Sequence, residues 1–117
     1  MGDLSRNFSR YEFKCDCNKC ECDTVDVELL EVLQATADYF DAAVTITSGH
    51  RCVDWNKSIG GADKSFHLYG RAADIVVDQV HPSTVQDYLL RVYDGQYGIG
   101  KYKNFTHLDT RTNSARW

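Results

Sequence analysis

One stretch of the chain, residues 65–77, reads SFHLYGRAADIVV. Its second half, from Ala72 to Val77, is a short run of mainly apolar and β-branched residues, which is the pattern of a buried β-strand. Asp74 interrupts that run. A carboxylate inside such a strand is buried or half-buried, which is costly unless a charged partner or a metal ion compensates it. The stretch therefore predicts both a strand of the sheet and a polar site on that strand.

Hydrophobic periodicity predicts the elements on either side of this strand. Apolar residues recur at helical spacing before it, where Asp23 or Asp26 can cap the first turn, and Pro82 can open a second helix after it. The predicted elements are a helical turn at 9–13, a helix at 26–40, a strand at 43–47, a helical turn at 52–59, a strand at 72–77, a helix at 82–93 and strands at 97–102 and 105–108. This order indicates an α+β fold with a small, mainly antiparallel sheet and two main helices.

Length and charge limit the classes of protein to which this chain can belong. The 117 residues predict one domain, 1–117, whose residues 1–22 form a cysteine-rich arm. With 13 basic and 17 acidic residues the net charge is −4, which argues against nucleic acid as a partner because phosphate binding needs a basic face. No run of about 18 apolar residues predicts a membrane span. The first residues lack the apolar segment of a signal peptide, so we expect synthesis in a reducing cytoplasm.

The five cysteines leave three chemical states open. They are Cys15, Cys17, Cys20, Cys22 and Cys52. The first four are spaced C-x-C-x-x-C-x-C, which contains one metal-binding knuckle, and the fifth can complete a ligand set. Their odd number leaves at least one free thiol if the others pair as disulfides. A reducing compartment favours a second metal site or free thiols over disulfides.

Histidines and carboxylates form a second group of candidate ligands. His67 precedes a turn at Gly70, and we expect His67 to end one extended segment so that the turn brings Asp74 to the same place. His107 and Asp109 share one face of the last strand because side chains alternate with period two. These are ligands that zinc accepts. A histidine in a strand is more often a surface or satisfied core residue, so the residue types alone leave both interpretations open.

Several segments of the chain together resemble a known family. Residues 65–74 match S-x-H-x-x-G-x-A-x-D, the signature of the zinc D-alanyl-D-alanine carboxypeptidases and their relatives (peptidase M15-like): the LAS peptidases, phage L-alanyl-D-glutamate endolysins and hedgehog domains. Further matches, in order, are NFSRYEF at 7–13, SGHR at 48–51, the N-x-x-x-G-G-A pattern at 56–62, FTHLD at 105–109 and ARW at 115–117. The beginning and the tail are similar to the small phage or prophage branch. The resemblance spans nearly the whole chain and implies a hedgehog-like zinc fold.

The resemblance implies roles for particular residues. His67, Asp74 and His107 correspond to the ligands of a catalytic Zn²⁺. Arg51 resembles the arginine that binds a carboxylate or carbonyl oxygen of the substrate, a task that suits a permanently charged, bidentate guanidinium. Ser65 is expected to bind substrate or to orient the site. The alternatives are a structural salt bridge for Arg51 and a turn-capping role for Ser65.

The catalytic base departs from the family pattern. Many relatives place an acid three residues before the last histidine ligand, and others place a histidine two residues before it; here these positions are Asn104 and Phe105. Asp109 is the candidate base because it shares a face with that last histidine, although it can equally serve to orient that ligand. His50 and Tyr102 are weaker candidates.

Three hypotheses for function follow. The first is a zinc peptidase, a monomer, that hydrolyses an amide bond of the peptidoglycan stem peptide, either the terminal D-Ala–D-Ala bond or an internal bond such as L-Ala–D-Glu. The second is a catalytically silent zinc domain that binds cell-wall peptide or a protein. The third is a phage structural component. For the enzyme we expect synthesis in the bacterial host cytoplasm and action at the cell wall.

Overall fold

The sheet of this protein has five strands in the order β1-β2-β4-β3-β5. A computed structural model describes residues 2–117 and confirms the predicted α+β class. The strands are β1 (Val44–Ser48), β2 (Ala72–Val77), β3 (Gly98–Lys101), β4 (Thr106–Asp109) and β5 (Ala115–Arg116). Neighbouring strands are antiparallel, except that β3 and β5 run parallel.

Three α-helices accompany the sheet, together with two short 3-10 helices. They are α1 (Val27–Phe40), α2 (Val53–Ser58) and α3 (Pro82–Val92), with η1 (Arg10–Phe13) and η2 (Phe66–Tyr69). The start of α1 is capped by Asp26, whose carboxylate accepts a hydrogen bond from the backbone of Leu29. Proline opens α3 as predicted, because its missing N–H is not needed in a first turn.

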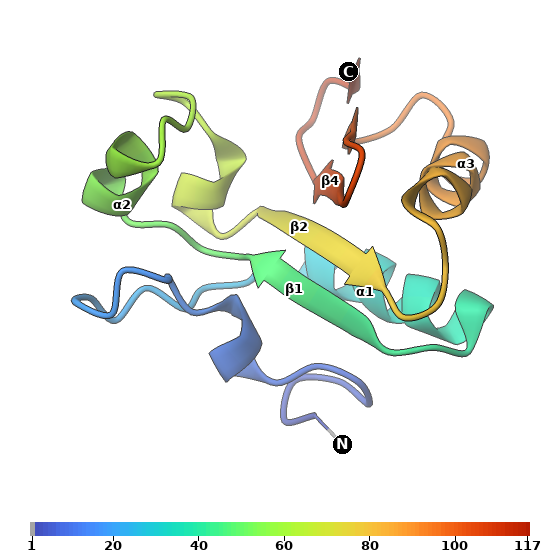
Figure 1. Ribbon diagram of the computed structural model, residues 1–117, viewed down its shortest axis with the longest axis horizontal. Helices are drawn as coiled ribbons and strands as arrows, with labels where there is room; N and C mark the ends of the chain where they lie inside the picture. Colours follow the sequence, from blue (N-terminus) through green and yellow to red (C-terminus); the bar gives the residue numbers. More distant parts are fainter. Residues whose placement is uncertain (1) are drawn as a thin grey trace.

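Alternation along β2 separates the hydrophobic core from the polar site. Ala73, Ile75 and Val77 belong to the buried core, to which α1 and α3 contribute Leu33 and Leu89. Figure 1 shows α1 crossing behind β1 and β2, with α3 beside the other end of β2. Asp74 points to the opposite face, because successive side chains of a strand alternate. The helices α1 and α3 therefore cover one face of the sheet and leave the other face for a site.

The N-terminal arm is part of the folded body. Its two phenylalanines, Phe8 and Phe13, are fully buried in the core cluster. Figure 1 shows the arm, in blue, alongside β1, and η1 contacts that strand. Ser9 and Glu12 form a capping box at η1, which is the helical turn predicted there.

Two features of the structure differ from the sequence prediction. His67 was expected to end an extended segment, and this is wrong: it lies in η2, where its backbone N–H donates to the Ser65 hydroxyl. A side-chain oxygen that caps a turn in this way favours helical over extended backbone. The strand β5 was not predicted, because two residues are too few to show an alternating pattern. Among residues 2–117, no helix is long and apolar enough to cross a membrane.

Candidate functional site

The side chains of His67, Asp74 and His107 converge on the face of the sheet that α1 and α3 do not cover. Asp74 in β2 and His107 in β4 are cross-strand partners, so their side chains lie next to each other. The Nδ1 atom of His107 lies 3.0 Å from Oδ1 of Asp74. The Nε2 atom of His67 lies 3.3 Å from the same oxygen. The structure thus brings together the three residues that the sequence predicts as ligands.

Gly70 makes the turn that places His67 beside β2. Its φ angle is +69°, in the left-handed region that glycine adopts without strain. A Cβ at this position would lie 2.6 Å from the backbone oxygen of Thr24, so a side chain has no room. The Gly70 carbonyl accepts a hydrogen bond from the backbone N–H of Asp26, which fixes the turn against the start of α1. The predicted role of this glycine is therefore confirmed.

The three donor atoms fit a tetrahedral zinc ion. Ligand bonds of about 2.0–2.1 Å at tetrahedral angles separate neighbouring ligand atoms by about 3.3 Å. The two separations above are close to this value, and all three ligand atoms lie within 4.8 Å of one another. All three residues are buried. Two imidazoles and one carboxylate leave a fourth position open, which is the composition of catalytic zinc sites.

Hydrogen bonds on the far side of each imidazole select the tautomer that a metal needs. Nδ1 of His67 lies 2.7 Å from the carbonyl oxygen of Gly49, which only accepts, so this nitrogen donates and Nε2 keeps its lone pair. Nε2 of His107 lies 2.7 Å from Oδ2 of Asp109 and donates to it in the same way. The Nδ1 lone pair of His107 is then directed at Asp74. Partners of this kind fix the orientation of metal-ligating histidines.

Asp109 is fully buried and held by Arg111. The guanidinium of Arg111 donates to both carboxylate oxygens, each over 2.7 Å, from Nε and Nη2. Such a bidentate pair is geometrically specific. Burial would raise the pKa of Asp109, but the hydrogen bonds from Arg111 and His107 outweigh it and hold that pKa well below its usual range. Asp109 therefore stays ionised and anchored.

The charges of the triad are mutually compensated. Burial opposes ionisation of Asp74, but the His107 and His67 rings, which donate to this carboxylate when they are protonated, hold its pKa well below the usual range. Burial likewise lowers the pKa of His107, yet the hydrogen bonds that the protonated ring makes to Asp109 and Asp74 raise it overall. The requirement that Asp74 be paired, expected from its place in an apolar strand, is met.

Arg51 lies next to the triad and retains donor capacity. Its Nη2 lies 3.3 Å from Oδ2 of Asp74, its Nη1 donates to Asn56 and its Nε donates to Ser48. A guanidinium carries five N–H donors. Three are accounted for by these contacts among the described residues, so two remain for a ligand. Arg51 therefore combines the structural salt bridge and the ligand-facing position that the sequence left as alternatives.

A cleft of about 490 Å³ opens over these residues. Its lining is Arg51, Gly60, Gly61, Ala62, Lys64, Ser65, Phe66, His67, Asp74, Tyr102, Phe105, His107, Arg111 and Trp117. Ser65 both caps η2 and reaches the cleft, so its two predicted roles are compatible.

Two residues of the site were given no role by the sequence analysis. The ring of Trp117 lies 4.9 Å from that of His107, and its backbone pairs with Ile99 and Lys101. The guanidinium of Arg111 lies over the rings of Trp117 and Phe66, at 5.0 and 4.7 Å. The signal available in the sequence was the position of Arg111 two residues after Asp109.

The candidate bases occupy different environments. Asp109 lies behind His107 and is absent from the cleft lining. His50 accepts from Thr24 through Nδ1 and donates to the Leu68 carbonyl through Nε2, so neither nitrogen is free for the cleft. Tyr102 does line the cleft, and its hydroxyl accepts from the indole of Trp117. Within residues 2–117, no carboxylate or imidazole side chain lines the cleft other than those of the triad.

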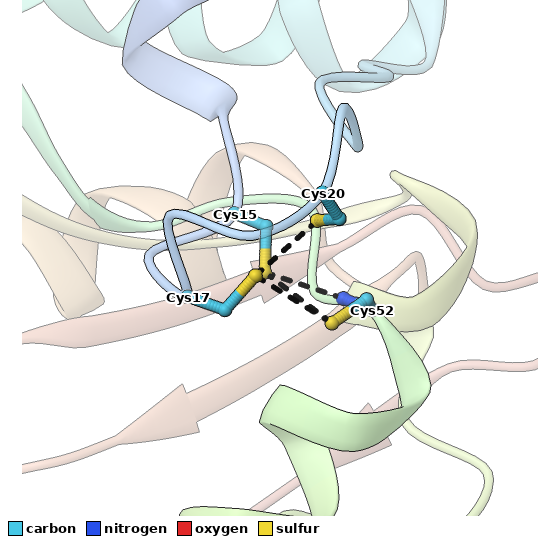
Figure 2. A group of neighbouring side chains, drawn as sticks. All are labelled: Cys15, Cys17, Cys20 and Cys52. Atoms are coloured by element: carbon cyan, nitrogen blue, oxygen red, sulfur yellow. Dashed lines mark hydrogen bonds between the residues drawn. The ribbon is translucent and has the colours of Figure 1, made fainter.

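Four of the five cysteines form a separate cluster. The thiols of Cys15, Cys17, Cys20 and Cys52 meet where the arm contacts the loop after β1 (Figure 2). Cys22 is not among the four.

Comparisons with known proteins agree with this geometry. The model of the peptidase M15 family matches residues 6–109, which include the triad, Arg51 and Asp109. The peptidoglycan L,D-endopeptidase MepK of Escherichia coli (strain K12) is 33% identical over 72 residues, covering 57% of this chain and 40% of the relative. The protein of the same name from Shigella flexneri matches equally. The chain thus spans less than half the length of these relatives. Because the family match covers most of its length, the chain belongs to the peptidase M15 family.

Proposed function

We propose that this protein is a zinc-dependent peptidase that hydrolyses an amide bond of the peptidoglycan stem peptide. The observation that carries the proposal is the convergence of His67, Asp74 and His107 on an open cleft, with Arg51 beside them. Two neutral imidazoles and one carboxylate match the donor set of hydrolytic zinc sites. When bound there, zinc polarises a carbonyl and lowers the pKa of water to near 7.

The residues of the cleft orient a peptide with a free or flanking carboxylate. Arg51 offers its two remaining N–H donors next to the triad, and a guanidinium binds a carboxylate in a fixed bidentate geometry. Lys64 adds positive charge to the lining, whereas the charge of Arg111 is compensated by its ion pair with Asp109. Stem peptides carry carboxylates, so a cationic cleft favours their binding over that of cationic peptides.

Asp109 acts in this proposal as a positioning residue. It holds a proton on Nε2 of His107 and so keeps Nδ1 free to bind metal. Its carboxylate is engaged by Arg111 and does not reach the cleft, which argues against direct proton abstraction from water there.

An internal bond of the stem peptide is the substrate that we favour. The relatives from Escherichia coli and Shigella flexneri are named as L,D-endopeptidases. The cleft is also open rather than enclosed on all sides, which accommodates a chain on either side of the scissile bond. A D-Ala–D-Ala carboxypeptidase is the other outcome, and product masses separate the two.

A non-catalytic binding domain is the second candidate. It is favoured by the cleft lining, which within residues 2–117 holds no carboxylate or imidazole side chain besides the triad, and by Asn104, which cannot accept a proton from water. Such a domain retains the fold, the metal and peptide binding without turnover.

The test is mass spectrometry of purified peptidoglycan after incubation with the protein, with and without a zinc chelator. The proposal expects chelator-sensitive products from the native chain and none from His67→Ala. The matched control is His81→Asn, which changes an exposed histidine that caps α3 and retains a capping side chain. Loss of a single alanine identifies a carboxypeptidase, whereas cleavage within the stem identifies an endopeptidase. Saturable binding with no product supports the second candidate, and full activity of His67→Ala refutes the zinc mechanism.

A further inference from the structure

Four cysteine thiols lie together at the junction between the arm and the loop after β1. The Sγ atoms of Cys15 and Cys52 are 3.8 Å apart, those of Cys17 and Cys52 are 3.9 Å apart, and those of Cys17 and Cys20 are 3.4 Å apart. All four lie within 4.8 Å of one another. Figure 2 shows the four side chains turned toward a common centre.

These separations match a tetrahedral thiolate site. Zinc–sulfur bonds of about 2.3 Å at tetrahedral angles place neighbouring sulfurs about 3.8 Å apart. A disulfide requires about 2.05 Å and joins only two of the four. Here Cys17 approaches both Cys20 and Cys52, so its sulfur is shared between neighbours rather than directed at one partner.

Backbone N–H groups donate to three of the sulfurs. The N–H of Lys19 points to Cys17, that of Cys52 points to Cys15 and that of Trp55 points to Cys52, over 3.3, 3.4 and 3.4 Å. Such donors stabilise negative charge on sulfur, and thiolates are the form of cysteine that binds metal. Each of these donors therefore favours the thiolate of the sulfur that it faces.

The cluster joins two segments that are distant in the sequence. Three thiols come from the arm and the fourth follows Arg51 directly. The same two segments meet through their backbones, because the N–H of His50 donates to the carbonyl of Phe13 over 2.9 Å. Gly49 makes this approach possible, since a Cβ there would lie 2.7 Å from the Cα of Phe13. A metal at the cluster would fix the arm to the loop that carries Arg51.

We infer that Cys15, Cys17, Cys20 and Cys52 form a second, structural zinc site that is distinct from the His67–Asp74–His107 centre. The four thiols release their protons to solvent when zinc binds. Four protein ligands close the coordination shell, which is the mark of a structural rather than a catalytic site. That the site holds Arg51 in place rests on the proposed function, whereas the metal site itself does not.

The first experiment uses the native chain alone. The full-length protein is stripped of metal under reducing conditions and titrated with Co²⁺. We expect two ions per chain, one of which gives the intense sulfur-to-cobalt charge-transfer absorption and the strong visible bands of a tetrahedral tetrathiolate. Zinc should then bleach these bands. This readout is independent of hydrolysis, so it survives if the chain proves to be inactive.

Variants assign the two ions. Cys17→Ser should lose the thiolate bands and one metal per chain, whereas His67→Ala should lose one metal and keep the bands. Cys22→Ser is the matched control, since it changes a thiol of the same segment that lies outside the group of four, and it should keep both metals.

Three results overturn the inference. One is a native chain that binds Co²⁺ without thiolate bands. Another is a native chain, purified under reducing conditions, whose intact mass shows the loss of hydrogens that disulfides cause. The third is loss of the thiolate bands in Cys22→Ser but not in Cys17→Ser. The first measurement needs no substitution, so the test stands even if the cysteine variants fail to fold.

Discussion

Replacing Asp109 by asparagine separates the two roles considered for this residue. The carboxylate accepts from Nε2 of His107 and, through both oxygens, from Arg111. Asparagine has nearly the same shape but only one acceptor atom, so its amide group must face a donor of either His107 or Arg111. Facing His107, the amide favours the tautomer with its proton on Nδ1, the atom directed at Asp74 and the metal position.

The change of tautomer should weaken metal binding by a predictable amount. Loss of an outer partner of a metal-bound histidine lowers metal affinity or activity by about 10–100-fold, or about 1.4–2.7 kcal/mol. We therefore expect Asp109→Asn to bind zinc at the triad about 10–100-fold more weakly and to regain activity when zinc is supplied in excess. If Asp109 were instead the general base, kcat would fall by about 10²–10⁴-fold and metal affinity would not change.

The assay is a competition between the protein and a chromophoric chelator, paired with peptidoglycan hydrolysis at several zinc concentrations. Asp78→Asn is the control, because it removes one carboxylate at an exposed position just after β2. Thermal unfolding of each chain checks that the fold is retained. Unchanged zinc affinity in Asp109→Asn, with activity that excess zinc does not restore, would refute the positioning role.

Three further perturbations test other parts of the structure. Arg51→Lys should retain the metal yet lower kcat/KM about tenfold or more, as measured by hydrolysis and metal analysis. The reason is that an ammonium group cannot contact three side chains and a ligand at once, as the planar guanidinium can. Leu33→Ala should cost about 2–5 kcal/mol in chemical denaturation, whereas Val27→Ala, at a side chain that is 68% exposed, should cost under about 0.5 kcal/mol; equal costs would contradict the assigned core. Burial, reinforced by the hydrogen bond to Glu28, raises the pKa of Tyr97 to about 12. The stability that this provides is present below about pH 10 and lost as the pH rises toward 12, and Tyr97→Phe should remove that pH dependence of the unfolding free energy.

Regular periodicity explains which parts of the fold were predictable from the sequence. The strand at 72–77 was predicted at its observed bounds, and the helix predicted at 26–40 begins one residue later, after its Asp26 cap. Each depends on local signals: a β-branched run, a capping carboxylate, an apolar stripe. The hairpin predicted around Lys103-Asn104 also forms, since β3 and β4 pair directly across it.

Non-local contacts account for what the sequence did not predict. The strand β5 forms because Ala115 and Arg116 pair with the edge of β3. A two-residue segment has no sequence pattern from which this pairing could be predicted. The grouping of four of the five cysteines likewise depends on tertiary contacts, because Cys52 meets the arm where Gly49 lies against Phe13. For the same reason the sequence left metal, disulfides and free thiols open.

The polar residues of the site can be recognised in the sequence because burying a charged side chain costs free energy. An aspartate in an apolar strand, or a fully buried acid such as Asp109, is tolerated only with partners, and those partners define the chemistry. The cross-strand pairing of Asp74 with His107 supplies one partner from the register of the sheet itself. The same register that buries Ile75 in the core thus fixes the spacing of two proposed ligands. A one-residue slip of β4 against β2 would turn His107 into the core and Leu108 toward the metal position. Folding of the core and assembly of the proposed metal centre should therefore be coupled in this sheet, and a substitution that weakens the pairing of β2 with β4 should reduce stability and metal affinity together.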